Sequence, residues 1–142
     1  MALDLVPLCS IDIVMGDTLL VGDGPSGFRA VAEVSSGAVH GERLSGTIAG
    51  NAMADWIVAN GGVGTVDVRG ILRTHDDALI HVSYGGRIDM SSGLPDGPIY
   101  VAPRFETSDE RYRWLNLVQA VGVGTLLGQD LHYDWYEVRA GS

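Results

Sequence analysis

The stretch Thr65–Tyr84, TVDVRGILRTHDDALIHVSY, decides the fold that we predict for this chain. Two runs of alternating side chains flank His75-Asp76-Asp77, a cluster typical of a turn, so the stretch is predicted to form a β-hairpin. If Thr74 pairs with Ala78, one face of the hairpin becomes wholly apolar, because successive side chains point to opposite faces of a strand. In that register Leu72 lies opposite Ile80, Gly70 opposite Val82, and Val68 opposite Tyr84.

The other face of this hairpin is polar, and its orientation is the main question that the sequence leaves open. If the polar face meets solvent, Asp67, Arg69 and His81 are ordinary surface residues. If it faces the interior, they form a charged cluster in a desolvated cavity, which is costly unless it has a use. Alternation fits both arrangements. A polar interior indicates acid–base catalysis, whereas an apolar interior favours a carrier or an assembly role.

The rest of the chain repeats the strand pattern in short segments rich in Val, Ile, Thr, Tyr and Trp. Twenty glycines are scattered along it, and signals such as Asn60-Gly61-Gly62 and Gly85-Gly86 mark tight turns. We therefore predict an all-β, antiparallel, closed or nearly closed β-barrel of about 8–10 strands, formed by residues 1–142 as a single domain. The expected strands are Leu5–Val14, Thr18–Val21, Phe28–Val34, Arg43–Ile48, Met53–Val58, Thr65–Thr74, Ala78–Tyr84, Ile99–Glu106, Leu115–Val123 and Leu131–Val138.

One short helical turn is expected between the last strands. Ser108 is suited to cap its N-terminus, and Asp109 and Glu110 suit the first turn of a helix. We expect this turn to lead directly into the strand that starts at Leu115.

Composition excludes several classes of function. The net charge is −9, from 18 acidic and 9 basic residues, which disfavours nucleic acid and anionic membranes as partners. All nine basic residues are arginine, and the absence of lysine excludes Schiff-base chemistry and pyridoxal phosphate attachment. No apolar run approaches the ~20 residues that cross a bilayer, and no signal pattern precedes the first strand, so we expect a cytoplasmic location.

The single cysteine, Cys9, excludes a disulfide within the chain and a thiolate metal cluster. It lies among apolar residues such as Leu8 and Ile11, where a buried, unreactive thiol is favoured over a nucleophile.

Several segments together resemble an uncharacterised bacterial and fungal family, the domain-of-unknown-function family three-two-three-seven. The similarity runs from about Gly16 to Val138, and its most specific part is Ala-Pro-Arg-Phe-Glu-Thr at 102–107 followed by Trp-Leu-Asn at 114–116. The resemblance implies a compact antiparallel β-barrel and often a homo-oligomer, with a dimer as the expected form, but no assured function. Gly70 departs from the family pattern where an aromatic residue is common, and Ala78 departs where a glycine is usual. The other matching segments are Asp55-Trp56, Asp67-Val68-Arg69, 72–80 and 133–138.

The strand Ile99–Glu106 carries a second set of polar candidates. Tyr100, Arg104 and Glu106 share one face, where Arg104 and Glu106 can form a structural ion pair. Alternatively, Arg104 stabilises an oxyanion or enolate while a carboxylate acts as base. Pro103 predicts that this stretch is an edge or a bulge.

Asp55 is a carboxyl group on an apolar strand face, which it shares with Met53 and Ile57. If it is buried, its pKa is raised and it suits proton transfer near neutral pH. The alternative is a hydrogen bond to a turn backbone. Trp56 and Trp135 offer large flat surfaces, either to wall a pocket or simply to pack in the core.

Two further patterns carry little weight. His132 with Asp134, and His75 with its two aspartates, lack a third ligand at a recognisable spacing, so we expect no metal site. The run Gly22–Gly27 fits the dinucleotide pattern G-x-G-x-x-G, but Pro25 and the strand-like residues after it predict a hairpin loop instead of the required helix.

The leading hypothesis is a small-molecule enzyme that uses cofactor-independent acid–base chemistry of the isomerase, cyclase or lyase type in a barrel pocket. The alternatives are a lipocalin-like carrier for a hydrophobic or aromatic metabolite, and a non-catalytic oligomeric interaction module. In the preferred register Tyr84 lies on the opposite face from Arg69, which makes it a lesser candidate. The predicted catalytic residues are Asp55, Asp67, Arg69, His81, Tyr84 and Arg104, and the predicted substrate-binding residues are Trp56, Tyr100, Glu106, Asn116 and Trp135.

Overall fold

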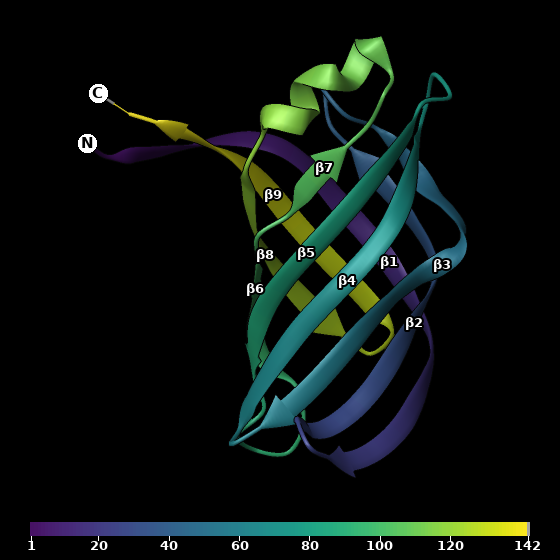
Figure 1. Cartoon of the computed structure of the whole chain (residues 1–142), viewed down its shortest axis with the longest axis vertical. Coiled ribbons are helices and arrows are strands. Elements are labelled where there is room, and N and C mark those ends of the chain that lie inside the picture. The colour runs from purple at the N-terminus through teal and green to yellow at the C-terminus, as the bar shows by residue number, and fades with distance from the viewer. Residues whose placement is uncertain (142) are drawn as a thin grey trace.

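Nine antiparallel strands and one short helix make up the computed structural model, which describes residues 1–141 (Figure 1). The helix η1 is a 3₁₀ helix that precedes the last two strands. The elements are β1 (Leu3–Gly24), β2 (Gly27–His40), β3 (Gly46–Asn60), β4 (Val63–Thr74), β5 (Leu79–Asp89), β6 (Asp96–Val101), β7 (Arg104–Glu106), η1 (Glu110–Leu117), β8 (Ala120–Leu127) and β9 (Asp130–Ala140).

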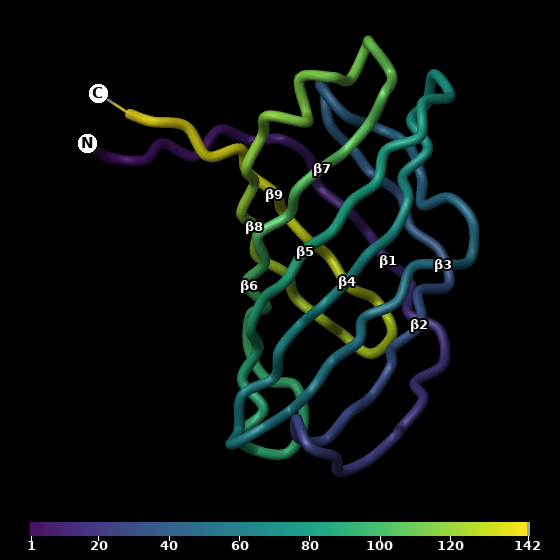
Figure 2. Tube along the Cα trace, viewed as in Figure 1, coloured from purple at the N-terminus to yellow at the C-terminus, as the bar shows by residue number. Residues whose placement is uncertain are grey.

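The strands form one sheet that closes into a ring. Their order is β4-β3-β2-β1-β9-β8-β6-β5-β7, and the pairing of β4 with β5 closes the ring. The Cα trace shows the strands crossing at a steep tilt around a common interior (Figure 2). The predicted all-β, antiparallel barrel is therefore confirmed. Closure removes most free strand edges, which would otherwise invite pairing with other chains.

The β4–β5 hairpin has the predicted register. Leu72 pairs with Ile80, Val68 with Tyr84, and the N–H of Thr74 donates to the carbonyl of Ala78. The turn itself is fixed by the Thr74 hydroxyl, which accepts a hydrogen bond from the N–H of Ala78 at 2.8 Å and donates to the Asp76 carboxylate at 2.6 Å.

Two predicted strand breaks are wrong. The segment from Leu5 to Val21 is one strand, because β1 absorbs its irregularities at 14–18 as bulges without losing its pairing with β2. The segment from Arg43 to Val58 likewise contains the single strand β3, with an irregularity between Ala49 and Ala54.

Pro103 lies where the predicted strand Ile99–Glu106 divides into β6 and β7. The single continuous strand predicted here is therefore wrong, and the break follows from the proline, which cannot donate a hydrogen bond to the ladder.

The helix begins one residue later than predicted and replaces the start of a predicted strand. Asp109, and not Ser108, is the N-cap, since its carboxylate accepts the N–H of Arg111 at 2.9 Å. The expected strand at Leu115 starts only at Ala120, because η1 continues to Leu117 and buries Leu115 against the core.

The two ends of the barrel differ. At the upper end in Figure 1, η1 lies over the rim, and its Tyr112 and Leu115 are buried. The β1–β2 hairpin extends the lower end. There the cross-strand rows place Leu20 and Phe28 on the inner face with Ala30 and Ile57, yet Leu20 is 70% and Phe28 40% exposed. Core side chains therefore leave the lower end of the inner face uncovered.

Among residues 1–141, no helix is both long and apolar enough to span a bilayer.

Candidate active site

The apolar face of the β4–β5 hairpin lines the interior. Val66, Val68 and Val82 are buried, whereas Asp67 and Arg69 are exposed. The alternative in which Asp67, Arg69 and His81 form an interior cluster is therefore incorrect. The apolar side chains gain free energy by leaving water, while the charged groups keep their hydration outside.

The polar residues of β6 and β7 also lie on the outer wall. In the cross-strand rows Arg104 lies opposite Ser83, Glu106 opposite His81, and Tyr100 opposite Arg87, and all three of these β6–β7 residues are exposed.

Asn116 and Trp56 lie outside the interior as well. Asn116 accepts the N–H of Thr107 at 2.8 Å and donates to the carbonyl of Thr107 at 2.9 Å, so its amide closes the loop before η1. Trp56 is exposed on the outer face of β3.

Asp55 is the predicted acid that does face the interior. It occupies one cross-strand row with Ala32, Val68 and Tyr84, and Val68 and Tyr84 are buried core residues. Because directly paired residues share a face of the sheet, the Asp55 carboxyl group lies on the inner wall.

An aromatic cluster fills the interior beside this row. The ring of Tyr84 lies edge-on to Tyr133, with centroids 5.7 Å apart, and to Trp135, with centroids 5.4 Å apart. Phe105 lies edge-on to Trp135 at 5.9 Å. The structure thus brings together Asp55, Tyr84 and Trp135 of the predicted residues. It adds Tyr133, which the alternation Leu131, Tyr133, Trp135 on an inner strand face could have identified.

Electrostatics distinguish Asp55 from the surface carboxylates. Burial raises its pKa to about 6, an effect opposed in part by a hydrogen bond from the backbone of Asp67. Burial also raises the pKa of Tyr84 and of Tyr133, so both phenols stay protonated. The interior therefore holds a carboxyl group with a pKa of about 6 beside two neutral hydroxyl groups.

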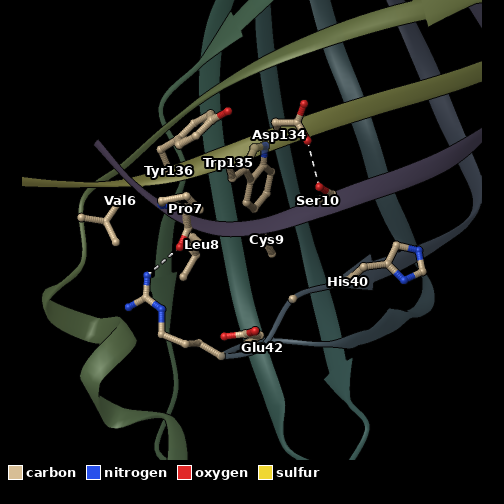
Figure 3. A pocket seen from close by; sticks show the side chains of 12 residues that line it. Val6, Pro7, Leu8, Cys9, Ser10, His40, Glu42, Asp134, Trp135 and Tyr136 are labelled. Carbon is tan, nitrogen blue, oxygen red and sulfur yellow. Dashed lines mark hydrogen bonds between the residues drawn. The ribbon is translucent and has the colours of Figure 1, made fainter. Parts of the chain in front are cut away.

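A separate pocket of about 480 Å³ lies where β1 and β9 meet the segment after β2 (Figure 3). Two of its polar side chains have partners, since Ser10 donates to Asp134 at 2.8 Å and Arg43 donates to the carbonyl of Pro7 at 3.1 Å. The buried Nε1 of the lining Trp135, by contrast, has no hydrogen-bond partner in the part of the chain that the structure describes. Burial raises the pKa of the lining thiol, Cys9, to about 12, which agrees with the predicted unreactive cysteine. This pocket is the weaker candidate for chemistry.

His132 contacts two carboxylates, one on its own strand and one on β1. Its Nδ1 lies 2.7 Å from Asp12 and its Nε2 lies 3.1 Å from Asp134, on the exposed face of β1 and β9. Both ring nitrogens are thus engaged by carboxylates. Within residues 1–141, no group of three or more His, Cys, Asp or Glu side chains is arranged to hold a metal ion.

These features define a class of protein: a small antiparallel β-barrel with one acid held in an aromatic interior. The chain belongs to the family of proteins of unknown function DUF3237, whose model matches residues 3–138.

Three relatives extend this comparison. The chain is 26% identical over 131 residues to the hydroalkoxylation enzyme phnH of Penicillium herquei, covering 92% of this chain and 80% of that protein. A solved β-barrel-like protein from Acinetobacter baumannii has 28% identity and a TM-score of 0.86, over 98% of each chain. A solved enzyme from Penicillium herquei has 25% identity and a TM-score of 0.72, over 96% of this chain and 93% of the other.

Proposed function

We propose that this protein is a small-molecule enzyme in which Asp55 transfers a proton to or from a substrate bound against the inner face of the barrel. The observation that carries the proposal is the placement of this acid in the interior with a pKa of about 6, beside Tyr84. A general acid or base is most effective when its pKa lies near the working pH.

The similarity to a hydroalkoxylation enzyme supports this chemistry. Hydroalkoxylation adds the O–H of an alcohol across a C=C bond. Within one molecule the reaction is a cyclising isomerisation, because no atom is gained or lost. A C–O bond forms, the π electrons of the alkene form a C–H bond, and the proton that the carbon receives is balanced by the proton that the hydroxyl releases. One carboxyl group can mediate both transfers and end in its starting state.

Tyr84 and Tyr133 have supporting roles in this proposal. Their raised pKa values keep them neutral, so their hydroxyl groups serve as hydrogen-bond donors to a substrate oxygen. The predicted isomerase, cyclase or lyase chemistry without a metal or an organic cofactor remains our proposal for this site.

We propose that the substrate approaches Asp55 from the lower end of the barrel. The inner-face residues Leu20 and Phe28 stay exposed there, whereas η1 covers the upper end. An apolar molecule would gain from covering these side chains.

The experiment uses 2-prenylphenol as a probe, in deuterated buffer. Ring closure by intramolecular hydroalkoxylation gives 2,2-dimethylchroman, with one deuterium on the carbon that was protonated. We expect turnover by the natural sequence and a loss of about 100-fold or more in Asp55→Asn, the size of a general acid–base contribution.

Glu33→Gln is the matched control, because Glu33 is an exposed acid on the outer face of β2, next to Ala32. It should retain full activity. Equal rates for Asp55→Asn and the natural sequence would reject the proposal. The proposal would also be rejected if the natural sequence did not convert the probe and the NMR signal of the Asp55 carboxyl group did not shift when the probe was added.

The apolar inner face favours one second candidate, a carrier of a hydrophobic or aromatic metabolite. A carrier would bind the probe without converting it, and Asp55→Asn would bind it as well as the natural sequence does.

A further inference from the structure

The ladder between β3 and β4 is interrupted next to Asp55. The register is the same on both sides, with Asp55 opposite Val68 and Val58 opposite Thr65, but the pairs Trp56–Asp67 and Ile57–Val66 are missing from it. In an antiparallel ladder, hydrogen-bonded pairs recur at every second residue. Counting from the turn pair Asn60–Val63, Trp56 and Asp67 belong to that set.

The two backbone groups that should meet at this position have other partners. The N–H of Asp67 donates to Oδ1 of Asp55 at 3.0 Å. The carbonyl of Trp56 accepts a hydrogen bond from Nη1 of Arg29 at 2.8 Å. Thus one missing backbone bond is replaced by two side-chain bonds, one from a residue of the inner face and one from a neighbouring strand.

These two replacements depend on each other. A backbone carbonyl without a partner is costly, so without Arg29 the Trp56 carbonyl would compete for the N–H of Asp67. That N–H cannot make a full hydrogen bond to the carbonyl and to the carboxylate together. A bound Trp56 carbonyl therefore leaves the N–H of Asp67 available to Asp55.

We propose that Arg29 is a positioning residue for Asp55: by binding the Trp56 carbonyl, it holds the ladder open and directs the Asp67 N–H to the Asp55 carboxylate. The catalytic meaning of this arrangement rests on the proposed function of Asp55, but the coupling itself can be measured without a substrate. Arg29 lies on β2, where it pairs with Val58 in the row next to the gap.

Three other titratable groups lie close enough to Asp55 to influence its pKa, and their effects must be distinguished from that of the Asp67 N–H. Tyr84 on β5, Tyr133 on β9 and the Asp67 side chain on β4 all interact electrostatically with Asp55. Both tyrosines stay neutral near pH 6, and the Asp67 side chain is exposed to solvent. A change in the Asp55 pKa on substitution of Arg29 should therefore come from the hydrogen bond of the Asp67 N–H.

The experiment is an NMR titration of the Asp55 carboxyl carbon in the natural sequence and in Arg29→Met. The N–H bond stabilises the ionised carboxyl, so losing it should raise the Asp55 pKa by about half to one unit. The Asp67 amide proton should also stop responding to the titration of Asp55. Arg29→Lys keeps a donor and a charge, and it should restore most of both signals.

Arg87→Met is the matched control. Arg87 lies in the same outer row as Arg29, linked through Val58 and Thr65, and its removal changes the net charge equally. The proposal fails if the Asp55 pKa shifts by the same amount in Arg29→Met and Arg87→Met. If Arg29→Met does not fold, Arg29→Gln provides the same comparison, because it removes the guanidinium and keeps a polar side chain.

The results for the two proposals are distinguishable. An inactive Asp55→Asn with an unshifted Asp55 pKa in Arg29→Met would retain the enzyme and remove the positioning role. A shifted pKa with a fully active Asp55→Asn would retain the coupling and remove the catalytic role.

Discussion

Trp135 on β9 packs edge-on against Tyr84 on β5, with ring centroids 5.4 Å apart and an interplanar angle of 74°. β5 and β9 are not neighbours in the ring, since β6 and β8 lie between them, so this contact crosses the interior. Aromatic pairs in this geometry contribute beyond the area that they bury. The pair therefore braces two separate parts of the wall as well as bordering Asp55.

Substitutions of Tyr84 should distinguish the contribution of its ring to stability from that of its hydroxyl group. Tyr84→Ala removes a buried ring and should lower the free energy of unfolding by about 3–5 kcal/mol. Tyr84→Phe keeps the ring and should cost only about 1 kcal/mol, the value of one hydrogen bond. Urea unfolding measures both. An alanine variant as stable as the phenylalanine variant would show that the ring does not brace the wall.

The contrast between the two hairpin faces shows how far sequence reasoning reached. Alternation gave the register of Thr65–Tyr84 and placed Tyr84 on the other face of the hairpin from Arg69, because both follow from the two-residue period of a strand. It did not identify the inner face. That choice depends on burial across the closed ring, where Val68 and Val82 meet side chains of distant strands.

The same distinction applies to the candidate site. The apolar neighbours Met53 and Ile57 pointed to Asp55, since a carboxyl group in such a row has no local reason to be there. Its partners could not be found from local sequence. Tyr133 comes from the far end of the chain, and the Asp67 N–H becomes available only because the β3–β4 ladder is interrupted.

Arg69 and Arg104, both predicted as catalytic residues, lie instead on the outer wall. Arg69→Ala and Arg104→Ala should therefore change the free energy of unfolding by no more than about 0.5 kcal/mol, as is usual for exposed positions. Turnover of 2-prenylphenol should also be unchanged. A loss of turnover with an intact thermal melt would show that this outer surface takes part in the reaction.

The raised pKa of Asp55 predicts a specific dependence of stability on pH. Its pKa is about 6 in the folded protein and 3.8 as the ordinary value, so the folded state holds the proton more tightly. The stability that this group contributes is fully present below about pH 4 and is lost as pH rises through 6.

The variant Asp55→Asn should remove this loss of stability at higher pH. The variant should match the natural sequence near pH 4 and exceed it by about 1–3 kcal/mol at pH 7.5. Urea unfolding at the two pH values tests this, and an equal difference at both would contradict it.

Asp76 predicts the opposite dependence at the upper end of the barrel. Hydrogen bonds from the Thr74 and Tyr112 hydroxyls lower its pKa to about 2, and the Tyr112 bond is 2.6 Å long. The stability contributed by this carboxylate is present above its ordinary value of 3.8 and is lost as pH falls toward 2. Tyr112→Phe removes one donor and should move the acid-unfolding midpoint to higher pH. Hydrogen exchange of η1 should rise with it, because Tyr112 ties η1 to the β4–β5 turn. An unchanged midpoint would show that η1 is held by its buried Leu115 alone.

The lower part of β1 predicts how the expected dimer forms. The pairing of β1 with β9 ends at Val14–Asp130, while its pairing with β2 continues to Gly24. One edge of residues 17–24 therefore lies outside both ladders, and its Leu19 is 53% exposed. A strand edge of this kind pairs readily with a copy of itself, since an antiparallel contact between identical strands satisfies two-fold symmetry.

Light scattering after gel filtration should show a dimer for the natural sequence and a monomer for Leu19→Lys, because a charge on such an edge opposes pairing. Leu79→Lys, at an equally exposed leucine of β5, should remain a dimer. A dimer that survives Leu19→Lys would place the interface elsewhere on the barrel, and a natural sequence that is monomeric would refute the dimer itself.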